Sequence, residues 1–308
     1  MRERLAGVQN LAFVTANHQL LGHGAVGKAD IVHAHEAKGV HWACWHHLTR
    51  RVPYLLTRRV DTLVHEKFIN RLCYSRAEKR VAISRAIQKS LDDKGWGDVD
   101  LIPSAMAGLP HSPEKTAAFR SQFPDRFLVG HAGALVDRHK GQRVLLKAAR
   151  NLATQHPDIH FVFFGQGEDA EELKRESEGM DNVTWMGFKE NIGDYLAGLD
   201  VFAFPSHNEG LGSVLLDVMD LGVPIVASDV GGIPDIVSHE DTGLLFTSGD
   251  SDGLTQALER LRDSYRLREA LSGSAKQQLT RYSAEVMAES YLELYKSIDY
   301  EAGGRFHG

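Results

Sequence analysis

The chain has 308 residues, of which 43% are hydrophobic and 25% charged, a composition that excludes wholesale disorder and a fibrous repeat. Its length favours two domains over one continuous core, and its net charge of -6 gives no reason to expect nucleic acid as a partner. Cys44 and Cys73 are its two cysteines, too few for a disulfide framework or a CxxC metal site.

Short apolar runs alternate with helical patterns from residue 30 onward, which is typical of βαβ units on a parallel sheet. In the first half, strands are expected at residues 31–33, 53–56, 80–83 and 99–102, and helices at 38–48, 63–74 and 85–94. A loop rich in proline and glycine at 103–113 then interrupts the alternation. We place the domain boundary at this loop.

The alternation restarts in the second half. Strands are expected at residues 126–131, 160–164, 183–186, 201–204 and 224–227, with a helix at 141–154. The tail at 252–300 has apolar residues at three-to-four spacing and is expected to be helical. The predicted fold class is therefore α/β, with two doubly wound, Rossmann-like domains facing each other across a cleft. Because parallel strands end at helix N-termini, which favour anions, we expect a phosphorylated ligand.

The charge is divided unevenly along the chain. Residues 1–112 carry 16 Lys and Arg against 10 Asp and Glu, and the remainder carries 19 against 31. Within the positive part, the segment 42–59 interleaves aromatic and cationic residues as interfacial surfaces do. This pattern suggests the hypothesis of a peripheral contact with an anionic membrane, although solvated faces without a partner would carry the same charges.

The membrane contact would be peripheral. No apolar run approaches the roughly 18 residues that cross a bilayer, and the N-terminus lacks an apolar secretory region. We therefore expect a cytoplasmic protein, with the inner face of the membrane as the place of any such contact.

The most informative stretch runs from residue 204 to 217 and combines a strand end, a glycine-bearing loop and a helix start. Gly210 and Gly212, on either side of Leu211, let the backbone approach a ligand. The N–H groups of Ser213 and Val214 would then point at a diphosphate. Carboxylates at the two ends of the stretch, Glu209 and Asp217, would accept hydrogen bonds from sugar hydroxyls. Alternatively, Glu209 complements a helix dipole and Asp217 is a solvated helix residue.

This stretch resembles the GT-B glycosyltransferases of the retaining family 4 type (glycosyl transferases group 1). That family has two acids separated by seven residues, followed by Gly-x-Pro-Val-Val-Ala, and the chain has Glu209, Asp217 and Gly-Val-Pro-Ile-Val-Ala at 222–227. The resemblance covers residues 126–300. It implies that Glu209 contacts the donor sugar and Asp217 the ribose.

A second match, residues 133–141, resembles the loop in which the family places an Arg and a Lys against the donor diphosphate. Lys140 is in the Lys position and Ala134 is in the Arg position, with Arg138 or His139 as nearby substitutes. A fixed cation would stabilise the charge that builds on the departing diphosphate without a metal. The catalytic candidates are thus Glu209, Lys140 and Arg138.

Further glycine turns follow strands in the order the family shows. The base-contacting loop of the family corresponds to the turn at Gly187 and Phe188. The full set of donor-binding candidates comprises Gly133, Gly165, Gly187, Phe188, Gly210, Leu211, Gly212, Ser213, Val214 and Asp217.

The first half resembles the family less completely, because little sequence precedes residue 30. His35, Arg58 and Arg59 are the acceptor-side candidates. The resemblance implies a shortened acceptor-side domain at 1–110, a donor-binding domain at 111–285, and a C-terminal helix and tail at 286–308 whose return to the first domain is left open.

The resemblance implies transfer of a sugar from a nucleotide diphosphate sugar to a hydroxyl of a carbohydrate or glycolipid, with retention and with no metal or other cofactor. Two alternatives stay open. The chain is a nucleotide-sugar-binding module without turnover, or it has another GT-B activity such as sugar-nucleotide epimerisation. His33 and His35 lie on one face of a predicted strand, but a metal site would need a third ligand.

Overall fold

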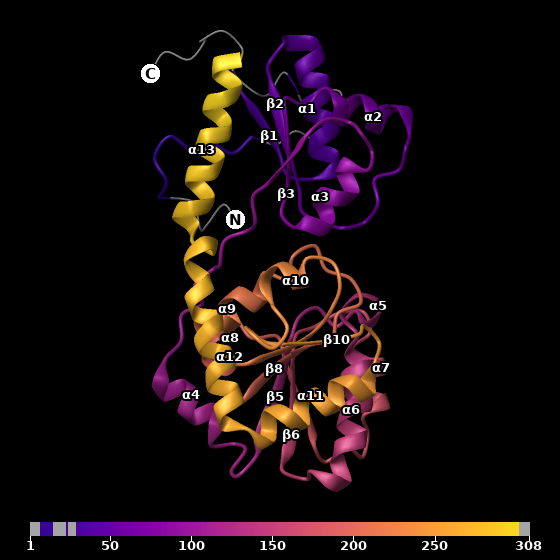
Figure 1. Cartoon of the computed structure of the whole chain (residues 1–308), viewed down its shortest axis with the longest axis vertical. Coiled ribbons are helices and arrows are strands. Elements are labelled where there is room, and N and C mark those ends of the chain that lie inside the picture. Colours follow the sequence, from indigo (N-terminus) through magenta and orange to yellow (C-terminus); the bar gives the residue numbers. More distant parts are fainter. Residues whose placement is uncertain (1–6, 15–22, 24–28, 302–308) are drawn as a thin grey trace. The chain divides into compact units, whose positions relative to one another are not determined.

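The computed structural model of the chain (Figure 1) describes residues 7–14, 23 and 29–301. These residues fall into two compact units. The first comprises the chain up to Ala82, residues 88–101 and the part from Tyr291 onward, and the second comprises residues 83–87 and 102–290. The division therefore follows Leu101, whereas the sequence analysis placed the boundary at 110. It also gives the last helical turns to the first unit from Tyr291 rather than from residue 286.

The first unit is built on a parallel sheet of order β1-β2-β3-β4. Its strands are β1 (Val32–Ala34), β2 (Tyr54–Arg58), β3 (Lys79–Ala82) and β4 (Val99–Leu101), and its helices are α1 (Ala37–Arg50), α2 (Phe68–Ser75) and most of α3 (Arg85–Asp92). All four predicted strands are confirmed within two residues. Helix α2 begins five residues later than predicted, because the Lys67 N–H and the Asn70 side chain both donate to the His65 carbonyl and form a local turn instead.

The final helix, α13 (Ala284–Glu301), supplies its second half to the first unit. Tyr295 Oη lies 2.7 Å from His33 Nδ1 on β1, and Tyr291 Oη lies 2.9 Å from Thr57 Oγ1 on β2. His33 Nε2 in turn lies 2.8 Å from Thr57 Oγ1. These bonds hold the two tyrosines of α13 on strands that lie more than 230 residues earlier in the sequence.

The second unit has a six-stranded parallel sheet of order β10-β9-β8-β5-β6-β7. Its strands are β5 (Phe127–Ala132), β6 (Ile159–Phe164), β7 (Val183–Gly187), β8 (Val201–Phe204), β9 (Ile225–Ser228) and β10 (Leu244–Phe246). Its helices are α4 (Pro113–Arg120), α5 (Asp137–Lys140), α6 (Gln142–Gln155), α7 (Ala170–Glu176), α8 (Ile192–Leu196), α9 (Val214–Asp220), α10 (Ile233–Ile236), α11 (Ser251–Asp263) and α12 (Tyr265–Gln278), followed by a 3₁₀ turn at Leu279–Tyr282 and the start of α13.

The chain order makes β5 the centre of this sheet, with β6 on one side and β8 on the other. The chain runs outward from β5 to β7 and then returns to begin again at β8. Such a reversal leaves a crevice at the carboxyl ends of the two central strands, which is where open α/β sheets bind ligands.

Both faces of the sheet are buried, so its strands are nearly continuous apolar runs. Phe161 and Phe163 face the core that α6 and α11 cover (Figure 1). Phe164 points to the opposite face, where its ring meets Phe119 of α4 and Tyr195 of α8. The predicted helical tail is confirmed, but it is broken into separate helices. Ser264 accepts a hydrogen bond from the Leu267 N–H and thereby starts α12 directly after α11.

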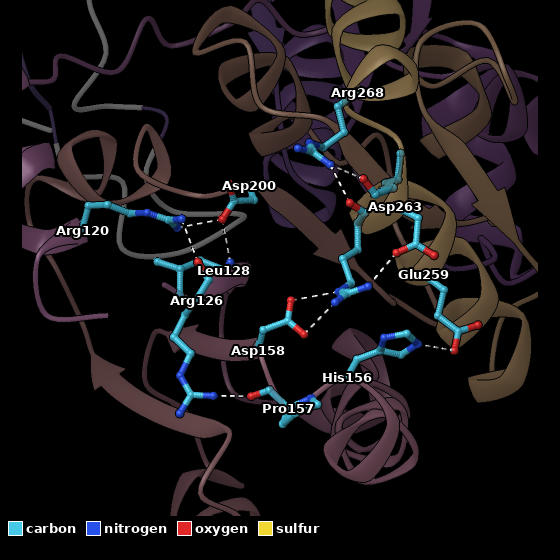
Figure 2. Close-up of polar contacts among 12 residues, drawn as sticks. Arg120, Arg126, Leu128, His156, Pro157, Asp158, Asp200, Glu259, Asp263 and Arg268 are labelled. Atoms are coloured by element: carbon cyan, nitrogen blue, oxygen red, sulfur yellow. Dashed lines mark hydrogen bonds and ion pairs between the residues drawn. The ribbon is translucent and has the colours of Figure 1, made fainter. Parts of the chain in front are cut away.

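Polar contacts tie together the amino-terminal ends of the strands (Figure 2). Asp200, just before β8, accepts hydrogen bonds from Arg120 and from the Leu128 N–H of β5, both at 2.7 Å. Asp158, just before β6, pairs with Arg262 of α11 at 2.9 Å. Asp200 and Asp158 are thus both paired with arginines at this edge of the sheet.

Within the described ranges, no helix combines the length and the apolar composition that crossing a membrane requires.

Candidate active site

A pocket of about 590 Å³ lies at the carboxyl ends of β5, β6 and β8 in the second unit. It is where the strand order predicts a ligand site. The pocket is lined by Ala132, Gly133, Ala134, Lys140, Phe164, Gly165, Gln166, Phe188, Lys189, Ile192, Phe204, Glu209, Gly212, Ser213 and Val214. Most of the lining is apolar or backbone, and the ion pair between Lys140 and Glu209 is part of it.

That ion pair joins the Lys140 ammonium, at the end of α5, to Oε1 of Glu209. Both side chains are mostly buried, with exposed fractions of 23% and 12%. Ser206 Oγ donates a second hydrogen bond to the same oxygen at 3.1 Å, and the ring of Phe204 lies 5.5 Å from the Lys140 nitrogen. The pair thus places one cation and one carboxylate inside a pocket with an aromatic wall, where charges act more strongly than in water.

Backbone contacts bring these two residues together although 69 positions separate them. The His139 carbonyl accepts hydrogen bonds from the N–H groups of His207 at 2.8 Å and Asn208 at 3.3 Å. Gly141 follows with φ of 65°, and a Cβ there would lie 2.1 Å from the Pro205 carbonyl oxygen. The loop after α5 and the loop after β8 therefore touch through their backbones, and a glycine is required at this contact.

A second close approach shapes the pocket between β5 and β6. Gly165 has φ of 137°, and a Cβ at this position would lie 1.9 Å from the Gly133 carbonyl oxygen. Its N–H donates to the Gly187 carbonyl at 3.0 Å, and the Gly133 N–H donates to the Phe164 carbonyl at 3.1 Å. Three turns that follow three neighbouring strands are thereby linked into one wall.

The floor beside Gly133 holds a buried histidine. His131 Nδ1 lies 3.0 Å from the Ala203 carbonyl, and Nε2 lies 3.3 Å from the amide nitrogen of Gln142. Gln142 also donates to the Ala134 carbonyl at 2.9 Å. Burial lowers the pKa of His131 to about 4, and the charge of Lys140 acts in the same direction. His131 is therefore neutral near pH 7, with Nδ1 carrying the proton, and Lys140 is the cation at this end of the pocket.

Most of the predicted donor-side residues come together in this pocket. Those that line it are Lys140, Glu209, Gly133, Gly165, Phe188, Gly212, Ser213 and Val214. Gly187 and Phe188 line an adjoining pocket of about 420 Å³ with Trp185 and Lys174. Gly210 and Leu211 are not among the lining residues, and Leu211 is buried in the core.

Arg138 does not line the pocket. Its guanidinium pairs with Glu168 at 2.5 Å, and both side chains are largely exposed. Ala134, in the family's Arg position, does line the pocket but presents only a methyl group. Among the described residues that line the pocket, no arginine accompanies Lys140.

Asp217 also lies outside the pocket lining. Its Oδ1 accepts hydrogen bonds from the N–H groups of Ala107 at 2.8 Å and Gly108 at 2.9 Å, in the loop before α4. Burial raises the pKa of Asp217, and these two bonds oppose the rise. In this geometry the carboxylate holds a loop backbone, and its predicted contact with a ribose stays a prediction.

Several lining residues were not singled out from the sequence. Gln166 follows the predicted turn at Gly165, and Lys189 follows the predicted turn at Phe188, so each lies one position beyond a recognised signal. Lys189 stacks over the ring of Tyr195 at 5.2 Å. Ile192 has no such signal, because it enters the wall only through the packing of α8.

The three acceptor-side candidates share a smaller pocket of about 290 Å³ in the first unit. His35, Arg58 and Arg59 all line it, at the carboxyl ends of β1 and β2. His33 and His35 do lie on one face, with ring centroids 3.9 Å apart. The described part of the chain contains no group of three His, Cys, Asp or Glu side chains placed to hold a metal ion.

The segment 42–59 does not form the exposed aromatic surface expected from its composition. Tyr54 and His46 are fully buried, and Trp42 and Trp45 are half-buried. Trp42 stacks on His46, and Tyr54 is part of the central strand β2. Part of the aromatic surface of this segment is thus buried in the first unit, and a peripheral membrane contact stays a prediction.

Comparison with known proteins finds relatives for the segment that contains this pocket. Residues 126–264 match the family model described as glycosyl transferases group 1. The chain is 29% identical over 227 residues to the lipopolysaccharide core biosynthesis glycosyltransferase LpsD of Rhizobium meliloti, covering 72% of this chain and 64% of LpsD. It is 25% identical to the phosphatidyl-myo-inositol mannosyltransferase of Mycobacterium leprae, covering 94% and 80% of the two chains. It therefore spans just under two thirds of LpsD.

Solved structures agree at the level of the fold. The crystal structure of Anabaena HepE in complex with UDP superposes with a TM-score of 0.81 at 22% identity, over 91% of this chain and 80% of HepE. HepE in complex with UDP-glucose superposes with a TM-score of 0.76 at 23% identity, over 87% and 79% of the two chains. The chain therefore has the GT-B fold, and its residues 126–264 match the model of the glycosyl transferases group 1 family.

Proposed function

We propose that the protein transfers a sugar from a UDP-sugar to a hydroxyl group of a carbohydrate or glycolipid acceptor. The observation that carries this proposal is the Lys140–Glu209 ion pair in a pocket of about 590 Å³ walled by glycine turns, inside the matched segment. A uridine donor is proposed because HepE was crystallised with UDP and with UDP-glucose.

Lys140 would bind the diphosphate of the donor, and Glu209 would bind its sugar. When the donor enters, its diphosphate competes with Glu209 for the Lys140 ammonium, since an anion of higher charge is the stronger partner. Lys140 then stabilises the negative charge that develops on the departing diphosphate. Glu209 is released to accept hydrogen bonds from the donor sugar. Gly133, Gly165 and Gly212 lack side chains that would keep the donor away from the backbone.

We further propose that the transfer proceeds with retention and without a metal. No side chain is assigned as the general base, because an oxygen of the departing phosphate could take the acceptor proton. The relatives LpsD and the phosphatidyl-myo-inositol mannosyltransferase are named for lipopolysaccharide and glycolipid synthesis. Their names support an acceptor of the cell envelope. We propose the cytoplasm, at the inner face of the membrane, as the place of the transfer.

The test combines ligand binding with turnover. Thermal-shift measurements with UDP, GDP and ADP should show selective stabilisation by UDP, because a ligand that binds only the folded state raises its melting temperature. Lys140→Ala should abolish most of that shift, since a charge-assisted hydrogen bond contributes about 1.5–3 kcal/mol. Lys147→Ala, an exposed lysine on α6, is the matched control and should behave as the unmodified protein.

Glu209→Gln should fold normally and still bind UDP, but it should lose transfer from UDP-sugars. Donor hydrolysis in the absence of acceptor provides the readout while the acceptor is unidentified. Near-normal turnover by Glu209→Gln would remove the role assigned to this acid, and equal stabilisation by all three nucleotides would remove the uridine assignment.

A second candidate function is a nucleotide-sugar-binding module without turnover. Ala134 supports it, because the family's second cation is absent from the pocket wall and Arg138 is paired with Glu168 instead. Binding of UDP-sugars without hydrolysis or transfer across a panel of acceptors would favour this module.

A further inference from the structure

The first unit has a cationic pocket that the donor reaction does not use. It opens at the carboxyl ends of β1 and β2, has a volume of about 290 Å³, and is lined by His35, Glu36, Ala37, Val40, Thr57, Arg58, Arg59, Val60 and Tyr74. Two guanidinium groups and one imidazole thus line the pocket together with a single carboxylate. The charge balance of the lining is positive.

Arg58 is held in place by uncharged partners. Its guanidinium donates to the carbonyl and to the hydroxyl of Thr62, the latter at 3.0 Å. These contacts orient the guanidinium without neutralising it. A planar group fixed in this way is prepared for bidentate binding of an oxyanion.

The charge of Arg59 acts on the two histidines beside it. Burial lowers the pKa of His35, and the charge of Arg59 lowers it further. His33 has a pKa of about 3 because of burial, His35 and Arg59, and both of its ring nitrogens are already engaged by Tyr295 and Thr57. His35 is therefore the imidazole that stays available to a ligand and that would gain a proton beside an anion.

The opposing charge is Glu36, the N-cap residue of α1. Its side chain makes no capping hydrogen bond, and the first turn of the 14-residue α1 contains no acidic residue. Ala37, the first residue of the helix, also lines the pocket. The positive end of the helix dipole thus adds to the arginines, and Glu36 is the carboxylate among the residues that line the pocket.

We propose that this pocket binds a phosphate group carried by the acceptor, with Arg58, Arg59 and His35 as its ligands. The role as an acceptor site rests on the proposed transferase function, but phosphate binding itself does not. Guanidinium and phosphate form paired, charge-assisted hydrogen bonds, and a pocket of this size admits the phosphate with part of the group that carries it.

The phosphate could belong to a soluble sugar phosphate or to a lipid headgroup. The rim of the pocket favours the lipid, because exposed apolar side chains lie at and after it. Val60 at the rim is 50% exposed, Leu63 in the loop that follows is 72% exposed, and Phe68, the first residue of α2, is 81% exposed. Apolar side chains beside a cationic pocket suit the junction of an anionic headgroup and its hydrocarbon chain.

The experiment follows His35 by NMR while inorganic phosphate and then glycerol 3-phosphate are added to the full chain in chloride buffer. We expect saturable binding, a rise in the pKa of His35, and tighter binding as the pH falls through that pKa, because a protonated imidazole attracts the anion. His35→Asn identifies the resonance. Arg59→Gln should weaken phosphate binding about tenfold, and Arg71→Gln, an exposed arginine of α2 that does not line the pocket, should not.

Glu36→Gln should change the affinity for phosphate in the opposite direction to Arg59→Gln. Removing this carboxylate should tighten phosphate binding several-fold, and it cannot do so by damaging the fold. Vesicles containing phosphatidylinositol or phosphatidylglycerol distinguish the two sources: retention of the protein on these vesicles, competed by glycerol 3-phosphate, identifies a lipid, and binding of the soluble phosphate alone identifies a soluble acceptor.

The proposal is overturned if phosphate leaves the His35 resonance unchanged, or if Arg59→Gln and Arg71→Gln weaken binding equally. Neither outcome depends on UDP binding or turnover, which are measured in the second unit. Loss of donor binding with intact phosphate binding would therefore reject the proposed function and leave this pocket standing.

Discussion

The location of the Lys140–Glu209 ion pair indicates a role in binding. An ion pair that is mostly buried contributes little net stability, because desolvation offsets the attraction between the charges. Here the pair lines a pocket large enough for a nucleotide, and its members come from segments that follow different strands, α5 after β5 and the loop after β8. We therefore interpret the pair as a binding site for a more highly charged anion, and not as an interaction that stabilises the fold.

At the same scale, His131 predicts a pH dependence of stability. Its pKa in the folded protein is about 4, lowered chiefly by burial from the ordinary value of 6.5. Unfolded chains take up the proton near pH 6.5, whereas the folded protein resists it until about pH 4. The free energy of unfolding should therefore be constant above pH 7 and should fall by roughly 3 kcal/mol between pH 6.5 and 4 from this residue alone.

Urea unfolding at a series of pH values measures this effect. In His131→Gln, whose side chain does not titrate, the decline between pH 6.5 and 4 should be shallower by about that amount. His33 titrates lower still and contributes in the same direction in both proteins, so the comparison isolates His131. Parallel curves for the two proteins would contradict the assignment of a neutral, buried imidazole beneath the pocket.

At the scale of the secondary-structure elements, the turns that follow the strands form the pocket wall. Sequence periodicity predicted β5, β6 and β8 within one residue, because strands buried on both faces are continuous apolar runs. Glycines at the following turns were also predicted, and the structure gives their reason. Gly165 brings its backbone against Gly133, and Gly141 brings its backbone against Pro205. The pocket wall is therefore made by backbone contacts that any side chain would separate.

Gly165→Ala tests this wall. The substitution adds a Cβ that would collide with the Gly133 carbonyl and forces φ of 137° on a residue with a side chain, so we expect a loss of at least about 3 kcal/mol in unfolding free energy and loss of UDP binding. Gly179→Ala is the control, because Gly179 has φ of 79° but nothing within 4 Å of an added Cβ. It should cost only about 1 kcal/mol. Similar costs for both variants would show that backbone strain, not the close approach, limits position 165.

At the scale of the whole molecule, the last helix, α13, contributes residues to both units. The second half of α13 belongs to the first unit, although residues 102–290, which precede it in the chain, belong to the second unit. Tyr291 and Tyr295 reach Thr57 and His33 of the central strands, and burial raises the pKa of both tyrosines. Completing the first unit thus requires residues from both ends of the sequence.

The double variant Tyr291→Phe/Tyr295→Phe should destabilise the first unit by about 1–3 kcal/mol, because it leaves His33 and Thr57 without two of their partners. UDP binding in the second unit should be unchanged. Hydrogen exchange reads the two units separately: faster exchange in β1 and β2 with unaltered exchange in β5 and β6 is expected. Equal acceleration in both units would contradict the assignment of these contacts to the first unit.

The sequence by itself determined the alternation of strands and helices and the glycine turns, because both depend on local pattern and on the rule that parallel strands end at one edge. The resemblance to a known family predicted one site for Lys140 and Glu209. Only the tertiary structure decided where the longer side chains go. Arg138 pairs with Glu168, and Asp217 holds the loop at Ala107 across 110 positions. Rotation about side-chain bonds and contacts between distant segments leave no periodic trace in the sequence, so no spacing rule could have predicted them.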